Sequence, residues 1–167
     1  MNNLERVGAI TPKQERLPNI VKLTILGEIK GKQRPKATRI GNTARVYTPK
    51  ETTYYENKVA NEYRRKYGTT MAFERNTPMK VVINVYHKLQ SIHYGKKGIN
   101  KSGLDKLNGK APVMLKPDCD NIAKICLDAL NEIAFNDDKE IDELIIKKHY
   151  AEQPRVDIEI SEIMYGE

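Results

Sequence analysis

Apolar and polar residues alternate along three stretches of the chain with the two-residue period of a half-buried β-strand. In residues 21–29 the side chains of Val21, Leu23 and Ile25 share one face, and residues 77–89 and 156–163 show the same alternation. His87 lies near the end of the second stretch, where we expect it to be exposed or hydrogen-bonded. Shorter strands are expected at residues 44–49, with Val46 pointing inward, at 113–115 and at 143–150.

Two further segments have the spacing of amphipathic helices. Residues 50–67 place Tyr55, Val59 and Tyr63 four positions apart, between a Thr-Pro start signal and Gly68. The second helix is expected to begin at Asn121 with Asp120 as its N-cap. It would bury six residues at helical spacing: Ile122, Ile125, Cys126, Ala129, Leu130 and Ile133.

These elements predict an α/β (α+β) fold with a mixed β-sheet and two main helices. The 167 residues fit one domain, which we place at residues 19–167. Residues 1–18 are polar, contain two prolines and show no period, so we expect a loosely held arm. Residues 91–111 contain four glycines and no clear period, and we interpret them as a lysine-rich insertion.

The charge balance favours a polyanionic partner. There are 29 Lys and Arg residues against 22 Asp and Glu, which gives a net charge of +7. No apolar run approaches the roughly 20 residues of a membrane span, and no signal peptide is recognisable, so we expect a cytoplasmic protein. The two cysteines have neither disulfide-framework nor zinc-finger spacing, and Cys126 is expected to be a small buried residue.

The basic residues concentrate in two segments. Residues 30–50 contain seven basic residues and no acidic one, which suggests phosphate contacts, although a solvated mobile loop is an equal alternative. Residues 91–111 are weighed in the same way, as a DNA-binding segment or an unstructured insertion. The candidate DNA-binding residues are Lys32, Arg34, Lys36, Arg39, Arg45, Lys96 and Lys97.

Four aspartates form two pairs, one on each side of the second helix. Asp118 and Asp120 flank one residue, so an extended backbone would direct both carboxylates toward one cation. Asp137 and Asp138 follow in a turn that could equally be solvated. A straight helix would separate the pairs by about 18 Å. We therefore expect either that the chain doubles back or that the pairs meet across a subunit interface.

Oxygen ligands of this kind favour Mg²⁺, with Mn²⁺ as an alternative, over zinc. Such a cation lowers the pKa of bound water and stabilises the charge that develops on a phosphate during hydrolysis. Lys124 lies one helical turn beyond Asp120, where it could neutralise that phosphate. The alternative is an ion pair with Asp120 or Asp128 at i, i+4 spacing, and the spacing does not decide between them.

Three blocks of sequence together resemble the RusA family of Holliday-junction resolvases. They are GKQRPKATR with ARVYTPKETTYYE, then PDCDNIAKICLDALNE, then FNDDKEI, and they span most of residues 20–150. The resemblance implies a RusA-like fold and an intimate homodimer that cuts four-way DNA junctions symmetrically with Mg²⁺. It assigns metal-binding and catalytic roles to Asp118, Asp120 and Asp138, assigns a catalytic or DNA-contacting role to Lys124, and leaves the part of Asp137 open. Glu140 stands where the family often has Gln, which puts a DNA contact there in doubt.

The combined expectation is a bacterial or phage-encoded endodeoxyribonuclease that resolves four-way junctions by paired phosphodiester hydrolysis. Its expected partners are branched DNA and a second copy of the chain, without a membrane or a small-molecule cofactor. Two alternatives stay open. One is a protein that binds branched DNA without cutting it, and the other is a metal-dependent nuclease of flaps or single strands.

Overall fold

A computed structural model describes residues 19–41 and 43–166. The predicted N-terminal arm at residues 1–18 lies outside the described residues. The fold is organised by a four-stranded sheet made of β1 (Ile20–Leu26), β4 (Met79–Lys88), β7 (Ile141–Ala151) and β8 (Arg155–Glu162). The strand order is β1-β8-β4-β7, with β4 and β7 parallel and the other neighbours antiparallel. The prediction of a mixed sheet is confirmed.

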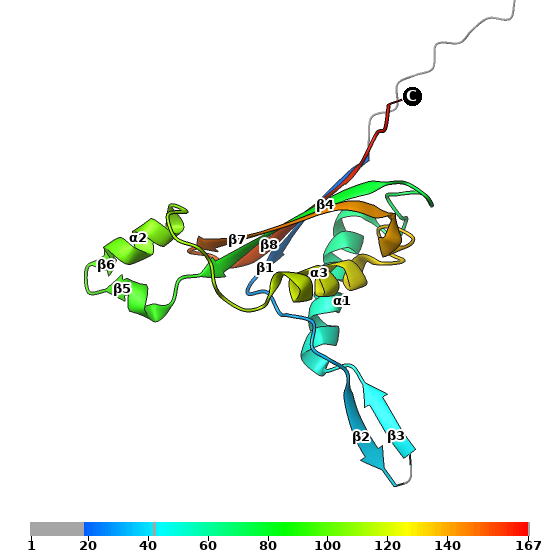
Figure 1. Ribbon diagram of the computed structural model, residues 1–167, viewed down its shortest axis with the longest axis horizontal. Coiled ribbons are helices and arrows are strands. Elements are labelled where there is room, and N and C mark those ends of the chain that lie inside the picture. The colour runs from blue at the N-terminus through cyan, green and yellow to red at the C-terminus, as the bar shows by residue number, and fades with distance from the viewer. Residues whose placement is uncertain (1–18, 42, 167) are drawn as a thin grey trace, which may run out of the picture.

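One face of this sheet forms the hydrophobic core. Val21, Leu23 and Ile25 of β1 are buried against equivalent residues of β4 and β8, as their alternation predicted. On the opposite face Arg155 stacks on Tyr86, with its guanidinium carbon 3.7 Å from the ring centroid, and the ring of Tyr86 stacks on that of His149. No helix covers this polar face within the described part of the chain (Figure 1).

Helices α1 (Lys50–Tyr67) and α3 (Cys119–Leu130) lie side by side across the apolar face of the sheet (Figure 1). Tyr55, Val59 and Tyr63 of α1 are buried, and Gly68 follows its end, which confirms both predictions. All the predicted core residues of α3 are buried except Ile133, which lies beyond its end and is partly buried. Cys126 is among the buried residues, and burial raises the pKa of its thiol to about 12.

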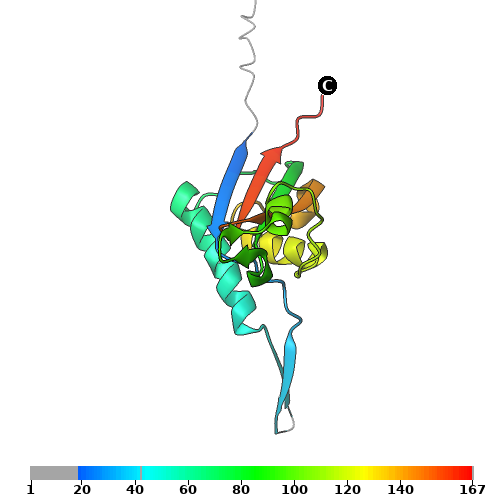
Figure 2. The same ribbon diagram turned by 90° about the vertical axis from the view of Figure 1, so that its left-hand side faces the viewer.

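A two-stranded ribbon projects from the body of the protein (Figures 1 and 2). It consists of β2 (Lys36–Ile40) and β3 (Thr43–Tyr47), which pair only with each other within the described residues. The expectation that Val46 points inward is wrong, because this side chain is 68% exposed. Residues Thr43–Tyr47 do form a strand, as predicted, but the described side chains on both faces of the ribbon are exposed, so Val46 has no core to face.

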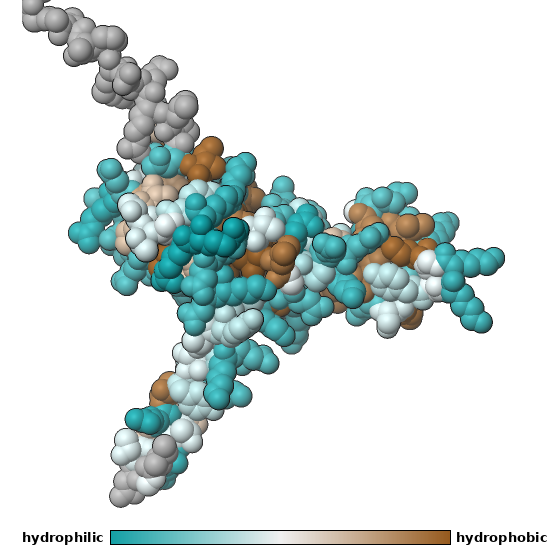
Figure 3. Space-filling view, turned by 180° about the vertical axis from the view of Figure 1, so that it is seen from behind, coloured by the Kyte–Doolittle hydropathy of each residue, from teal (hydrophilic) through white to brown (hydrophobic). Residues whose placement is uncertain are grey.

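Residues 91–107 form a small lobe at the end of β4. It contains η1 (Ser91–His93), β5 (Tyr94–Gly95), β6 (Gly98–Ile99) and α2 (Lys101–Leu107). The lobe is closely packed, because a Cβ atom on Gly103 would lie 2.6 Å from Cγ2 of Ile99. Figure 3 shows apolar residues at its centre and hydrophilic residues at its outer end. The alternative of an unstructured insertion is therefore wrong.

Two smaller predictions also fail. Residues 113–115 form no strand and belong to the irregular segment that leads to α3. His87 is buried, with 8% of its surface exposed, and its Nε2 atom has no hydrogen-bond partner among the residues that the structure describes. Neither described range contains a helix with the length and apolar character needed to cross a membrane.

Candidate active site

The two aspartate pairs lie at opposite ends of α3. Asp118 occupies the N-cap position and Asp120 lies in the first turn, so the helix begins two residues earlier than expected. The Asp118 side chain makes no capping hydrogen bond, and both carboxylates are exposed. Because the N-terminus of a helix carries partial positive charge, it stabilises these two anions close together. Two carboxylates with hard oxygen donors are therefore available at this end of the helix.

The next turn of α3 supplies Lys124. Its Nζ atom lies 3.4 Å from Oδ2 of Asp120, and both side chains are more than 60% exposed (62% and 64%). The sequence left open whether Lys124 pairs with Asp120 or Asp128, and the structure shows the pair with Asp120. An exposed pair at this spacing contributes only about 0.3–0.5 kcal/mol. Lys124 can therefore leave Asp120 for a phosphate at little cost.

An open groove of about 470 Å³ adjoins Asp118. It lies between the segment that follows β1 and the segment that enters α3. Its lining contains three lysines and one carboxylate. Lys32 is paired with carboxylates outside the lining, so Lys30 and Lys116 supply the positive charge that attracts an anion to the side of Asp118. The lining residues are Ile29, Lys30, Gly31, Lys32, Gln33, Lys116, Pro117, Asp118 and Asn121.

Gly31 allows the two walls of this groove to approach each other. A Cβ atom at position 31 would lie 2.8 Å from Cβ of Pro117, a distance that real Cβ atoms essentially never show. The proline ring cannot rotate away, so any larger residue at 31 would push the walls apart. The backbone amide of Lys32 also donates to the carbonyl oxygen of Asn121 at 3.4 Å. The basic segment is thus fixed directly against the start of α3.

Lys32 anchors the same segment through its side chain. Its ammonium group forms ion pairs with Glu56 of α1 and with Asp128 of α3, the latter at 2.7 Å. Partial burial lowers the pKa of Lys32, but the hydrogen bonds to Asp128 and Glu56 outweigh that effect and raise it. A phosphate contact by Lys32 stays a prediction, and in the structure its charge is already matched by two carboxylates.

Lys148 of β7 is a site residue that the sequence interpretation missed. Its Nζ atom donates to the carbonyl oxygens of Leu115 and Pro117, the second at 3.1 Å. These hydrogen bonds hold the segment that ends at Asp118. The chain doubles back after α3, which was one of the two expected ways of bringing the aspartate pairs together. However, the returning strand β7 brings Lys148, and not Asp138, to the start of the helix. The signal in the sequence that could have identified Lys148 is its place on the inward-facing side of the strand, between Ile146 and Tyr150.

The buried imidazole of His87 lies near Lys148. Burial lowers the pKa of His87 below its usual value of 6.5, the charge of Lys148 lowers it further, and Glu28 partly offsets these effects. His87 is therefore held in its neutral form. Its role in the structure is that of a core residue at the end of β4.

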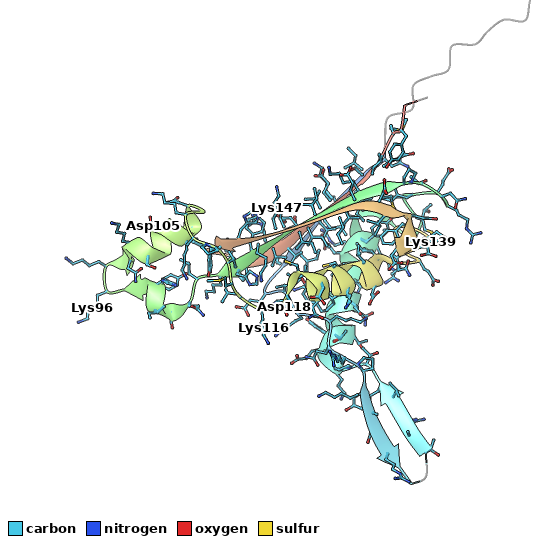
Figure 4. All side chains as sticks on the ribbon, viewed as in Figure 1. Lys96, Asp105, Lys116, Asp118, Lys139 and Lys147 are labelled. Carbon is cyan, nitrogen blue, oxygen red and sulfur yellow. The ribbon has the colours of Figure 1, made fainter. Side chains whose placement is uncertain are left out.

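The second aspartate pair lies beyond the other end of α3. Asp138 begins the short helix η2 (Asp138–Glu140), and Figure 4 shows its neighbour Lys139 at the opposite end of α3 from Lys116 and Asp118. Asp137 accepts a hydrogen bond from the backbone amide of Lys139 at 3.1 Å and forms an ion pair with its side chain. The hydrogen bond from the backbone amide of Lys139 lowers the pKa of Asp137, and the interaction with the Lys139 side chain lowers it further. Asp137 thus serves as a cap, whereas the Asp138 side chain is exposed.

Glu140 has a structural environment. It is 8% exposed, and its Oε1 atom accepts a hydrogen bond from the backbone amide of Asn76 at 2.8 Å. A side chain buried in this way fixes the loop before β4. The Glu140 carboxylate thus has a structural partner inside the protein, and we assign no DNA contact to it.

Within one chain the two aspartate pairs are not brought together. Among the described residues, no three His, Cys, Asp or Glu side chains lie close enough to hold a metal ion. The twelve residues of α3 alone span about 18 Å. Asp118 and Asp120 have the donor type that Mg²⁺ prefers, and Mg²⁺ is often held by one or two carboxylates together with substrate phosphates. These two residues fit such an ion, whereas Asp138 of the same chain does not.

The remaining candidate DNA-binding residues lie on the two projections of the molecule. Arg34 precedes the ribbon, which carries Lys36, Arg39 and Arg45, and all four side chains are exposed. Lys96 and Lys97 form the turn between β5 and β6 at the outer end of the lobe (Figure 4). The structure therefore separates the basic residues into two groups on different sides of α3.

Comparison with known proteins connects this arrangement with a nuclease family. The family model described as endodeoxyribonuclease RusA matches residues 27–161. A Bacillus subtilis (strain 168) protein, the uncharacterized protein YqaN, is 28% identical over 144 residues, which cover 86% of this chain and 96% of that protein. The match to the family model includes both aspartate pairs, the groove and the ribbon.

Proposed function

Because this chain belongs to the RusA family of endodeoxyribonucleases, we propose that it resolves four-way DNA junctions by metal-dependent hydrolysis of paired phosphodiester bonds. The observation that carries the proposal is the position of Asp118. This exposed carboxylate lies on the wall of a groove that also contains Lys30, Lys32 and Lys116. Cation ligands and phosphate-attracting groups thus occur side by side, as phosphodiester hydrolysis requires.

Asp118 and Asp120 would hold Mg²⁺ or Mn²⁺, and the third carboxylate would be Asp138 from a second copy of the chain. When bound, the ion supplies charge neutralisation at the phosphate and a water molecule of lowered pKa. The residues of the chain position the substrate around it. Lys30 and Lys116 attract the DNA backbone into the groove, and Lys124 leaves Asp120 to meet the scissile phosphate.

A homodimer accounts both for the separated aspartates and for paired cleavage. Two-fold symmetry that placed Asp138 of each copy beside Asp118 of the other would create two equal sites. The two sites would then face the two strands of like polarity at a four-way junction. In this arrangement neither site is complete in a monomer, so cleavage is coupled to assembly.

The test is cleavage of a synthetic four-way junction by the wild type and by Asp118→Asn, Asp120→Asn and Asp138→Asn, with Mg²⁺, with Mn²⁺ and with EDTA. The wild type should produce symmetric nicks only with the metals, and each variant should lose most of its activity while still binding the junction. Full activity in all three variants, or equal activity in EDTA, would refute the proposal. Duplex, flap and single-stranded substrates at the same salt concentration show whether four-way junctions are preferred. A preference for flaps or single strands would instead support a metal-dependent nuclease of those substrates.

The described residues of one chain contain no complete carboxylate set, which also favours a second candidate, a protein that binds branched DNA without cutting it. Its binding would depend on salt but not on metal. It predicts tight junction binding and no product with any divalent ion. The same junction assay separates the two functions, since only the nuclease gives nicked strands.

A further inference from the structure

The β2–β3 ribbon is an exposed structure that contributes nothing to the core. The side chains of Lys36, Ala37, Thr38 and Arg39, and all five of Thr43–Tyr47, are exposed. An isolated two-stranded hairpin is at best marginally stable in water, and the described side chains of this ribbon are exposed rather than packed against the body. Such a projection gains stability when it lies against a partner, and its composition indicates which partner.

The charge of the ribbon is complementary to a polyanion. The ribbon carries Lys36, Arg39 and Arg45, and the longer segment from Lys30 to Lys50 contains seven basic residues and no acidic residue. The segment that joins the ribbon to the body also lines the groove beside Asp118. A nucleic acid bound in that groove would therefore also be able to contact the ribbon.

The strand register gives the ribbon two different faces. Lys36 is paired with Tyr47, and Thr38 with Arg45, so these four side chains share one face. The other face consists of the pairs Ala37 with Val46 and Arg39 with Ala44. The first face is rich in hydrogen-bonding groups, whereas the second is mostly small and apolar. Arg39 on the second face donates to the carbonyl oxygen of Gly41 at 3.2 Å, which keeps it close to the tip.

The dimensions of the ribbon match one groove of duplex DNA. Five residues per strand extend about 17 Å, and the strands lie about 4.8 Å apart. The major groove of B-DNA is about 12 Å wide and admits a two-stranded ribbon, whereas the minor groove is about 6 Å wide and would have to be widened to take one. We propose that the ribbon enters the major groove of a duplex arm beside the cleaved phosphate, with the Lys36–Thr38–Arg45–Tyr47 face toward the bases.

This proposal rests on the proposed function for its substrate and adds a means of sequence preference. An arginine in the major groove can donate two hydrogen bonds to N7 and O6 of guanine, the commonest base-specific contact. Arg45, in the middle of the hydrogen-bonding face, is positioned for this contact, with Thr38 beside it. Arg39 on the opposite face would contribute charge without reading bases. The choice of cutting position would therefore depend on the sequence under the ribbon.

Arg45→Ala and Arg39→Ala form a matched pair for testing the proposal. Both remove one arginine from the same exposed ribbon, but from opposite faces. The full-length protein is bound to a four-way junction of mixed sequence in EDTA, and dimethyl sulfate then probes guanine N7 in the major groove. The wild type should protect one or two guanines in each contacted arm. Arg45→Ala should lose this protection, and its affinity for this junction should fall about tenfold below that of the wild type, with no preference left over a junction that lacks guanine at those positions.

The variant Arg39→Ala should keep the N7 protection and lose only salt-dependent affinity. Equal loss of protection in both variants, or protection that neither variant changes, would overturn the proposal. Junction cleavage by the wild type without any N7 protection would overturn it too, while leaving the proposed function intact. N7 protection that Arg45→Ala removes, without cleavage under any metal, would support the ribbon proposal and refute the proposed nuclease function. A wild-type protein that binds no junction would overturn both.

Discussion

The Nζ atom of Lys148 lies 3.1 Å from the carbonyl oxygen of Pro117, the residue immediately before Asp118. This hydrogen bond joins the middle of β7 to the segment that enters α3. Because Lys148 also donates to the carbonyl oxygen of Leu115, one ammonium group fixes two points of that segment. The position of Asp118 thus depends on a residue thirty positions later in the chain.

Replacing Lys148 with Met should slow junction cleavage on the order of tenfold, or about 1.4 kcal/mol in the activation barrier. The apolar side chain leaves two carbonyl oxygens without their donor and lets Asp118 move. Lys148→Arg, which keeps a donor, should recover part of the rate. Lys147→Met is the control, because it removes the same charge from the neighbouring exposed residue. If both Met variants lose activity equally, the effect is one of net charge and the positioning role is wrong.

Mixed dimers test whether the site is shared between subunits. Neither Asp118→Asn nor Asp138→Asn should cut as a homodimer, but a heterodimer of the two would contain one intact site and one doubly altered site. We expect it to nick one strand at roughly half the wild-type rate. The measurement is junction nicking by co-expressed chains purified through two different tags. If Asp138 acts within its own chain, each site carries one substitution and no activity returns.

Gly31→Ala should weaken cleavage more than it weakens folding. The added methyl group meets the ring of Pro117, so the lysine-lined wall must move away from Asp118. We expect a loss on the order of tenfold in junction cleavage, about 1.4 kcal/mol, with the denaturation midpoint measured alongside. Gly95→Ala is a matched control, since its Cβ would meet nothing closer than the carbonyl oxygen of Gly98 at 3.7 Å. Wild-type cleavage by Gly31→Ala would show that the close contact has no part in the site.

His87 should make the protein less stable in mild acid. Its pKa in the folded state is lowered below 6.5, so the unfolded chain binds this proton more readily. The free energy of unfolding therefore falls as the pH drops below about 6.5, and above that pH the effect is absent. In His87→Leu the loss of stability between about pH 7.5 and pH 5 should be smaller than in the wild type. Guanidinium unfolding at both pH values measures this, and an unchanged difference would contradict it.

The core could be predicted from the sequence because its signals are local. The alternation of Val21, Leu23 and Ile25 and the four-residue spacing of Tyr55, Val59 and Tyr63 each identify a buried face, and all six residues are buried. Val46 has the same kind of pattern but is exposed. A strand pattern shows which side chains share a face, but it does not show whether another element covers that face.

The site was harder to predict because its contacts join distant parts of the chain. The aspartate pairs are visible in the sequence, and the helix length correctly indicated that one straight helix holds them apart. The contact of Lys148 with Pro117 depends on the parallel pairing of β4 and β7, which no local signal specifies. For the same reason the burial of His87 follows from its place beside Tyr150 in that pairing.

The ribbon leaves the body at Lys36 and returns at Tyr47, and these two residues are paired with each other. The two ends of the ribbon therefore join the body side by side, whatever the length of the ribbon between them. Residues could be removed or added two at a time, one on each strand, without displacing α1 or the groove. The ribbon is thus an exchangeable module: on the proposal that it reads DNA, replacing this segment would change reach and base preference while leaving Asp118, Asp120 and the groove in place.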